Sequence, residues 1–325
     1  MRRREFLGLA AGAAASWPLA VRAQQAKGML RVGMVGFVPR TSPLVTVFAR
    51  RLAELGYREG ENLIIDYMQA AGTDKALDAG YREVAARKPD ILMAIGPEAA
   101  LKAALASTQT TPIVMFAIEF DPIAQGYVSS LARPGGRITG LYFQQIELVV
   151  KRLQFFSEAI PDFNSAIVFY DQTSGDQWKV AEAAGGKLGL RLSGVDLHEP
   201  PFDYERALAE APVDNRKNLF VLTSPGFFID RERQAKFALR NRLASIFGAR
   251  QWVDAGGLMS YGASFEKMSE RMVDILVQVA RGAKPGDLPI EQPTKFEFVI
   301  NLATARALGL EFSPTLLGRA DEVIE

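Results

Sequence analysis

The side chains that could carry out chemistry in this sequence are mostly carboxylates, because the chain contains no Cys and a single His. Without Cys there can be no disulfide, thiol nucleophile or Cys-ligated zinc, and one His excludes the usual multi-histidine metal centres. His198 precedes Glu199-Pro200-Pro201 with no nucleophile signalled beside it, so we interpret it as a loop residue. The sequence also lacks a phosphate loop, a complete dinucleotide fingerprint and a G-x-S-x-G elbow. We predict no catalytic residue, no metal and no cofactor.

Four acidic residues follow the ends of predicted strands, namely Glu98, Glu119, Asp121 and Asp171. Two of them could form a carboxylate pair for hydrolysis of the glycosidase type. Alternatively they bind a cationic group or pair with neighbouring basic residues, and we favour that interpretation. An exported, carboxylate-dependent hydrolase therefore remains an alternative to a binding protein.

Polar and aromatic residues also gather where predicted strands end. In an open parallel sheet, ligands bind beyond the carboxyl ends of the strands. Two of these ends come directly before helix starts, where free N–H groups favour an anionic group. The predicted ligand-binding residues are Phe37, Thr41, Ser42, Gly96, Pro97, Glu98, Glu119, Asp121, Asp171, Ser224, Phe227, Ser260 and Tyr261.

The residue types in this set suggest what the ligand is. The helix starts at Thr41-Ser42 and Gly96–Glu98 would hold a carboxylate, and Glu119 with Asp121 would hold an ammonium group. Phe37 and Tyr261 could flank an apolar body. These features favour a small amine-bearing solute, such as an aromatic or branched amino acid. The competing interpretation is that Glu119 pairs with a nearby Arg.

The elements that must position these residues alternate between short apolar runs and amphipathic segments. Ser42 with Pro43 begins a helix that Gly56 ends, and Ser264 begins a helix with an apolar stripe that Gly282 ends. This alternation predicts βαβ units and a parallel sheet. The expected strands are 30–35, 63–67, 91–95, 113–116, 138–141, 166–170, 190–197, 219–222, 245–247, 258–261 and 296–300, and the expected helices are 43–55, 75–87, 98–107, 147–159, 175–188, 228–243, 264–281 and 302–308.

Two such α/β series of similar size follow one another, and the second is trailed by a strand–helix–strand tail. We therefore expect an α/β fold of two Rossmann-like lobes with parallel sheets, joined by three crossover strands. Lobe one is predicted to hold residues 30–142 and 258–288, and lobe two residues 143–257 and 289–325.

The first 23 residues are typical of an export signal. Arg3-Arg4 precedes the apolar run from Phe6 to about Ala15, and Val21-Arg22-Ala23 is a small-residue cleavage site. The arginine pair fits the twin-arginine signal, and the apolar run is shorter than the roughly 20 residues of a membrane span. Cleavage would remove four positive charges and one negative charge, taking the net charge from +1 to −2. We predict a periplasmic protein with no lipid anchor, because no Cys could carry the lipid.

The composition fits a soluble globular protein, at 48% hydrophobic and 23% charged residues. With 38 basic and 37 acidic residues, the chain offers no electrostatic basis for binding nucleic acid.

Several longer motifs resemble those of one family. They are Leu55-Gly56-Tyr57-Arg58-Glu59-Gly60-Glu61-Asn62, Asp121-Pro122, Leu131-Ala132-Arg133-Pro134-Gly135-Gly136, Ile138-Thr139-Gly140, Ala255-Gly256-Gly257-Leu258-Met259-Ser260-Tyr261-Gly262, Lys284–Phe296 and Arg319–Glu325. With them the chain resembles the ABC transporter substrate-binding proteins of the tryptophan/tyrosine type, in the type I periplasmic-binding group. The likeness extends from the signal peptide to the last residue.

The resemblance implies two lobes that close on a small-molecule solute in the cleft between them. It also implies delivery to permease subunits in the inner membrane, driven indirectly by an ATPase, and we expect a monomer. Ser260-Tyr261-Gly262 matches the family pattern, whereas Gly96-Pro97-Glu98, Glu119-Phe120 and Ser224–Phe228 depart from it near the expected ligand. A ligand-sensing subunit of a membrane receptor is a further alternative.

Overall fold

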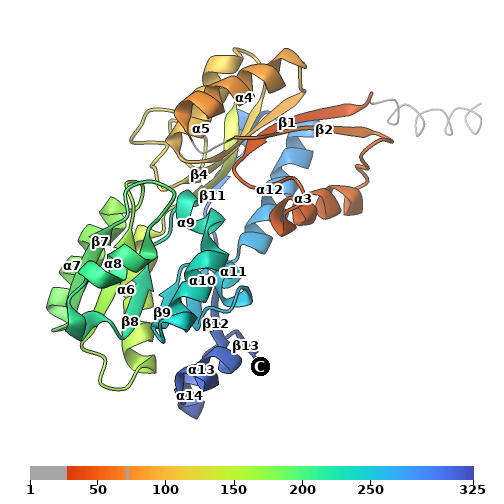
Figure 1. Ribbon diagram of the computed structural model, residues 1–325. Coiled ribbons are helices and arrows are strands. Elements are labelled where there is room, and N and C mark those ends of the chain that lie inside the picture. The colour runs from red at the N-terminus through yellow and green to blue at the C-terminus, as the bar shows by residue number, and fades with distance from the viewer. Residues whose placement is uncertain (1–27, 71–72) are drawn as a thin grey trace, which may run out of the picture.

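The computed structural model describes residues 28–70 and 73–325, so the predicted signal over residues 1–23 lies outside the described residues. The described chain forms two lobes, each built on one β-sheet (Figure 1). We call the six-stranded sheet with its helices lobe one, and the seven-stranded sheet with its helices lobe two. All strands of the first sheet pair in parallel, and the second is parallel except where β10 meets β12.

Lobe one has the strand order β11-β5-β4-β3-β1-β2, in which the inner strands are almost continuously buried. Helices α3 and α12 pack their apolar residues on one face, and α4 and α5 cover the other. Burial on both faces explains why these strands are apolar runs rather than alternating patterns. The strands are β1 (Leu30–Gly36), β2 (Leu63–Gln69), β3 (Ile91–Gly96), β4 (Ile113–Ile118), β5 (Ile138–Phe143) and β11 (Ile290–Glu291), and the helices are α3 (Pro43–Glu54), α4 (Asp74–Ala86), α5 (Glu98–Ser107) and α12 (Phe265–Ala280).

Lobe two has the order β13-β12-β10-β9-β8-β6-β7. Helices α6, α7, α13 and α14 cover one face of its sheet, and α8 to α11 cover the other. Its strands are β6 (Ser165–Tyr170), β7 (Arg191–Asp196), β8 (Asn218–Val221), β9 (Ala244–Phe247), β10 (Met259–Ala263), β12 (Phe296–Asn301) and β13 (Glu322–Ile324), and its helices are α6 (Ile146–Ala159), α7 (Gly175–Lys187), α8 (Tyr204–Glu210), α9 (Pro225–Ile229), α10 (Arg231–Arg240), α11 (Arg250–Asp254), α13 (Leu302–Leu308) and α14 (Pro314–Leu317).

The chain passes between the lobes at three points: between β5 and α6, at Ser264 between β10 and α12, and between β11 and β12. Two of these crossings differ from the expected boundaries. Strand β10 pairs with β9 and β12 and so belongs to lobe two, while β11 pairs with β5 and so belongs to lobe one. Strand pairing, which the local sequence pattern does not report, sets both boundaries.

The single helix expected over residues 228–243 is two helices, α9 and α10. The first begins earlier than expected because the Ser224 hydroxyl caps it, accepting from the Phe227 N–H, and Pro225 fits its first position. The second ends at Arg240, and Arg242 then adopts a left-handed φ of 54°. The break between them at Asp230 turns α9 toward the other lobe (Figure 1).

Candidate functional site

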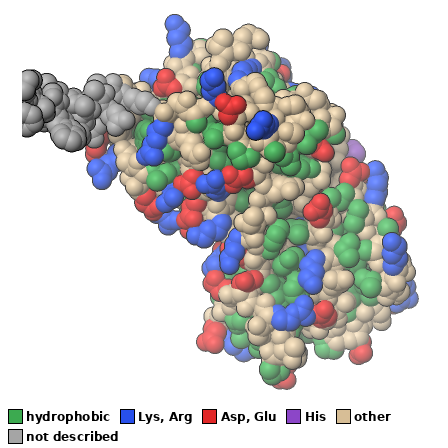
Figure 2. Space-filling model, turned by 180° about the vertical axis from the view of Figure 1, so that it is seen from behind, with side chains coloured by type: hydrophobic (Ala, Val, Ile, Leu, Met, Phe, Trp, Pro, Cys, Tyr) green, Lys and Arg blue, Asp and Glu red, His purple; other side chains and the backbone are tan. Residues whose placement is uncertain are grey.

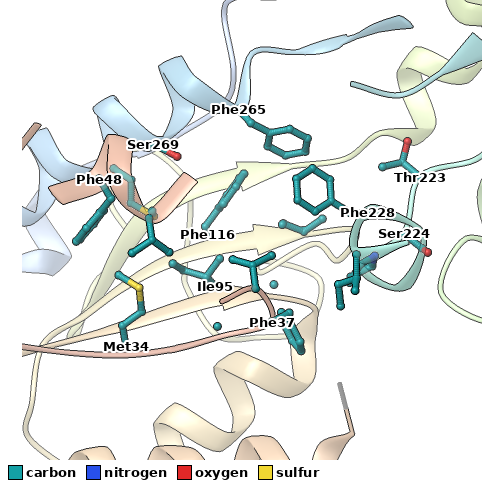
Figure 3. Close-up of a pocket in the computed structure, with 18 of the residues that line it drawn as sticks. Met34, Phe37, Phe48, Ile95, Phe116, Thr223, Ser224, Phe228, Phe265 and Ser269 are labelled. Carbon is teal, nitrogen blue, oxygen red and sulfur yellow. The ribbon is translucent and has the colours of Figure 1, made fainter. Parts of the chain in front are cut away.

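A cavity of about 150 Å³ lies between the two lobes. Residues of both lobes line it, and in the close-up their rings and thioethers point into a common space (Figure 3). None of the lining side chains carries a charge at neutral pH. The lining residues are Met34, Gly36, Phe37, Val38, Val45, Phe48, Tyr67, Ile95, Gly96, Phe116, Ile118, Gln145, Thr223, Ser224, Pro225, Phe228, Ile229, Phe265, Ser269 and Met272.

The lobe-one wall of this cavity is mostly apolar, apart from the hydroxyls of Tyr67 and Ser269, and it is rigidly held. Met34 on β1, Phe116 on β4 and the α3 residue Phe48 all belong to the buried core of lobe one while also facing the cavity. Met272 completes this wall from the apolar stripe of α12. These side chains are at most 6% exposed, so core packing fixes their positions.

The lobe-two wall combines aromatic and polar groups. Phe228, on α9, packs edge-on against the rings of Trp252 and Phe265, with ring centroids 5.5 Å apart in both cases. Because Phe265 begins α12 of lobe one, this contact joins the two lobes at the cavity. The guanidinium of Arg231 lies 5.1 Å from the Phe228 ring and donates to its carbonyl.

A buried arginine lies behind the polar part of this wall. Arg152, on α6, is 0% exposed and its guanidinium donates to three oxygens. Nη2 donates to the Gln145 Oε1 at 2.6 Å, Nη1 to the Thr223 Oγ1 at 3.3 Å, and Nε to the Tyr261 carbonyl at 2.9 Å. The network therefore links the first crossing, the end of β8 and strand β10.

Glu119 follows β4 at the first crossing, and its carboxylate accepts the Gln145 backbone N–H at 2.8 Å. Burial raises the pKa of Glu119 to about 7, against the opposing effects of that hydrogen bond and of Arg152. Burial also lowers the pKa of Arg152 to about 10, with Glu119 acting in the opposite direction. Yet among the described residues no carboxylate oxygen lies within 4.0 Å of the Arg152 nitrogens, so the two charges interact only at longer range.

Three of the predicted ligand-binding residues line the cavity: Phe37, Gly96 and Ser224. Gly96 has a φ of 122°, and a Cβ at this position would lie 2.6 Å from the Phe37 ring. The missing side chain thus makes room for that ring. Ser224 contributes no free polar group, because its hydroxyl accepts from the Phe227 N–H and donates to the Asp171 carboxylate.

The predicted helix-start residues do not line the cavity. Thr41 is exposed, and Ser42 precedes α3 without a side-chain capping bond. Pro97 precedes α5, and the Glu98 carboxylate accepts from the Tyr127 hydroxyl at 2.7 Å and from Lys102 at 3.0 Å. The Tyr127 hydrogen bond is the main cause of a lowered Glu98 pKa.

The other predicted carboxylates are occupied by local hydrogen bonds. The Asp121 Oδ1 accepts the N–H groups of Ile123 and Ala124, at 2.8 and 3.2 Å. The Asp171 Oδ1 accepts from the backbone and hydroxyl groups of Thr173 and Ser174. Asp and Asn at turns commonly bond the backbone in this way. Among the described residues that line the cavity there is no Asp or Glu.

The three remaining predicted residues pack in or near the cores. Phe227 is 0% exposed and packs against Phe202, so its ring faces the lobe-two core and not the cavity. Ser260 is fully buried in β10. Tyr261 packs its ring between Phe155 and Phe296, and contributes only its carbonyl to the Arg152 network.

Several residues that line the cavity were not among the predicted ligand-binding residues, because their sequence patterns indicate a buried hydrophobic core. Phe48, Phe265 and Met272 lie on apolar helix stripes, and Phe116 lies in an apolar strand. Phe228 could have been predicted to line the cavity, because it lies next to Phe227 in the segment that departs from the family pattern. Gln145 and Thr223 become recognisable only once the fold brings Arg152 to both.

Within the part of the chain that the structure describes, no group of three or more His, Cys, Asp or Glu side chains is arranged to hold a metal ion. In the same residues no helix combines the length and apolarity needed to span a bilayer.

Comparison with known proteins places these features in context. A family model described as ABC transporter substrate binding protein matches residues 42–324. A tyrosine-binding protein of Clostridioides difficile is 25% identical over 284 residues, which cover 81% of this chain and 76% of that protein.

Solved structures share the two-lobed fold. A conserved domain protein from Vibrio cholerae has a TM-score of 0.79 at 22% identity, covering 91% of this chain and 99% of its own. The ABC domain of Streptococcus pneumonia in complex with L-Trp has a TM-score of 0.77 at 21% identity, covering 91% and 100%. The fold is that of type I periplasmic binding proteins, as expected from the sequence.

Proposed function

Because this chain belongs to the family of ABC transporter substrate-binding proteins, we propose that the cavity between its lobes is the solute site and that the solute carries an aromatic or branched apolar body. Proteins of this family bind small molecules and work with ABC permeases. The role of the chain is therefore solute binding, and the proposal concerns which solute it takes and where.

The observation that carries the proposal is the convergence of five phenylalanine rings from both lobes. In lobe one, Phe37 follows β1, Phe48 lies on α3 and Phe116 on β4. Phe265 begins α12, and Phe228 comes from α9 of lobe two. A cavity of roughly 150 Å³ is large enough to hold a benzene ring, and this cavity has about that volume. The tyrosine-binding relative and the L-Trp complex support an aromatic solute here.

We also propose that the protein acts in the periplasm. The support is the twin-arginine pattern at Arg3-Arg4, the cleavage site at Ala23 and the absence of Cys from the sequence. In this proposal the mature protein is a monomer that is not lipid-anchored, binds its solute without chemical turnover and passes it to permease subunits of the inner membrane.

Ligand screening tests the proposed solute. Thermal-shift measurements with aromatic amino acids, branched amino acids, aromatic acids and sugars should show stabilisation by aromatic or branched compounds and none by sugars. The Phe228 ring contacts Trp252, so tryptophan fluorescence gives an independent signal for occupation of the cavity. Stabilisation by sugars alone would contradict the proposal.

A further inference from the structure

The polar end of the cavity is organised by a side chain that does not line it. Arg152 is fully buried, and a guanidinium carries five N–H donors and no acceptor. Every group that faces it must therefore present an oxygen, and at the cavity these groups are the side chains of Gln145 and Thr223.

This constraint fixes the orientation of the Gln145 side-chain amide. Because its Oε1 accepts from Arg152, its amide nitrogen must face the other way. Gln145 is 1% exposed and lines the cavity, and among the described residues no acceptor is bonded to its Nε2. Among the described residues, the buried side-chain atoms without a hydrogen-bond partner are the Ser42 Oγ, the Gln251 Oε1 and the Ser260 Oγ. The unpaired Gln145 Nε2 is not one of them, so it is open to the cavity and can donate to a ligand or to water there.

Thr223 is constrained in the same way. Its Oγ1 accepts from Arg152, and no acceptor among the described residues takes its hydroxyl proton. Ser224 beside it differs, because both its hydrogen-bonding directions are used within lobe two. The free polar groups at this end of the cavity are thus two donors, the Gln145 amide and the Thr223 hydroxyl.

We infer that this end of the cavity is a subsite for the carboxylate of the solute, with Gln145 and Thr223 donating to it and Arg152 as the positioning residue behind them. The inference rests on the proposed function. It follows from the two free donors, and from a lining without a negative charge. It also follows from the buried Arg152, which has no carboxylate oxygen within 4.0 Å in the described chain and which Glu119 reaches only at longer range. A carboxylate supplies acceptors for both donors and a negative charge close to Arg152. An ammonium group would find only the second lone pair of the Thr223 hydroxyl, and Arg152 would repel it.

The inference predicts a preference among probes that share one ring. By calorimetry, 3-phenylpropionate should bind roughly tenfold to a hundredfold more tightly than 2-phenylethylamine, because the acid accepts hydrogen bonds from both donors whereas Arg152 repels the amine. Equal or tighter binding of the amine would overturn the carboxylate subsite while leaving the aromatic site intact. Failure of every aromatic or branched compound to bind would overturn the proposed function and the subsite with it.

The variant Gln145→Glu gives the sharpest test. The new side chain has the same shape and still accepts from Arg152, but it replaces the amide donor with a carboxylate oxygen. We expect at least a tenfold loss of affinity for 3-phenylpropionate, a gain for 2-phenylethylamine and an unchanged or higher melting temperature. A purely structural role for Gln145 would not reverse the order of the two probes, and unchanged order in the folded variant would overturn the inference.

Two further variants keep the test decisive. Thr223→Val removes the second donor with little change of shape and should weaken 3-phenylpropionate several-fold while leaving the amine unaffected, even if Gln145→Glu does not fold. Ser269→Ala is the matched control, because it removes a cavity-lining hydroxyl from α12 that has no contact with Arg152. Acid affinity that falls as much in Ser269→Ala as in Thr223→Val would contradict the assignment of the carboxylate to the lobe-two end.

Discussion

The two walls of the cavity are held in place by different interactions. The lobe-one wall is formed largely by core side chains that also face the cavity, among them Met34, Phe48, Phe116 and Met272. The lobe-two wall depends on Gln145 and Thr223 with a buried cation behind them, and on Phe228 held between Trp252 and Phe265. Packing shapes the first wall and directional hydrogen bonds shape the second, so we expect the first to select the body of a solute and the second its polar group.

Ion pairs occur on the surfaces of both lobes. Figure 2 shows basic and acidic side chains side by side on the surface of lobe one. In this lobe, Arg50 and Arg51 pair with acidic residues of α3 and α12. Among the ion pairs in the described residues, each joins residues of the same lobe. The lobes meet instead through the cavity rings, the crossings and the Glu119–Gln145 hydrogen bond.

The largest effect should come from breaking the backbone that supports the lobe-two wall. In Gly262→Ala the new Cβ would lie 1.7 Å from the Gly248 carbonyl oxygen, so strand β10 would have to move, taking the Tyr261 carbonyl that Arg152 binds with it. We expect a loss of about 4 kcal/mol or more in the free energy of unfolding, measured with urea.

The matched control for that variant is Gly186→Ala. This glycine lies in helix α7, and a Cβ there meets no atom within 4 Å. The change should be neutral or stabilise by up to about 1 kcal/mol. A Gly262→Ala protein within 1 kcal/mol of wild type would show that the close approach of β10 is not needed.

Substitutions of two neighbouring phenylalanines distinguish a core residue from a cavity residue. Phe227→Ala removes a fully buried ring and should cost about 3–5 kcal/mol of stability. Phe228→Ala removes a half-buried ring of the cavity and should cost less stability, but should weaken an aromatic solute by about 0.5–1.5 kcal/mol, up to roughly tenfold. Urea unfolding and calorimetry on both variants measure the contrast; if Phe227→Ala spared stability and abolished binding, the assignments would be exchanged.

A smaller effect should come from Glu119, which stands between the two walls. Its pKa of about 7 in the folded protein exceeds the ordinary value of 4.5, so the folded state holds the proton more tightly than the unfolded state. Stability should therefore fall as the pH rises from about 4.5 to about 7, and Glu119→Gln should remove this fall and stabilise the protein by about 1–3 kcal/mol at pH 8. Melting temperatures of both proteins across this range measure it.

Glu98→Gln is the control of opposite sign. The pKa of Glu98 is lowered, chiefly by the Tyr127 hydrogen bond, so its ionised form stabilises the fold above its ordinary pKa and that contribution is lost in acid. The variant should be less stable than wild type at pH 8, where Glu119→Gln is more stable. The same pH trend in both variants would argue against a specific effect of burial at Glu119.

The fold could be predicted from the sequence because short sequence patterns determine its helices and strands. Apolar strands alternating with amphipathic helices predict parallel sheets, and caps such as Ser264 mark helix starts that the structure confirms. The sequence could not assign β10 and β11 to their sheets, because pairing partners are distant in the chain.

The site was harder to predict from the sequence than the fold, for physical reasons that differ between its residues. Asp121 and Asp171 follow strands, as ligand-binding acids do, but their oxygens satisfy the turns in which they lie. Which of Phe227 and Phe228 faces the cavity depends on where α9 begins, and Ser224 decides that. The donor character of Gln145 depends on Arg152, seven positions further along the chain on α6.

The most direct test of the two-wall account is a crystal structure of the protein with an aromatic carboxylate, such as 3-phenylpropionate, at saturation. The account predicts the ring among Phe37, Phe116 and Phe228, with a carboxylate oxygen within hydrogen-bond distance of the Gln145 Nε2. A ligand bound instead in the charged hollow lined by Arg231, Arg250 and Glu266, or bound with its carboxylate toward the lobe-one wall, would contradict it.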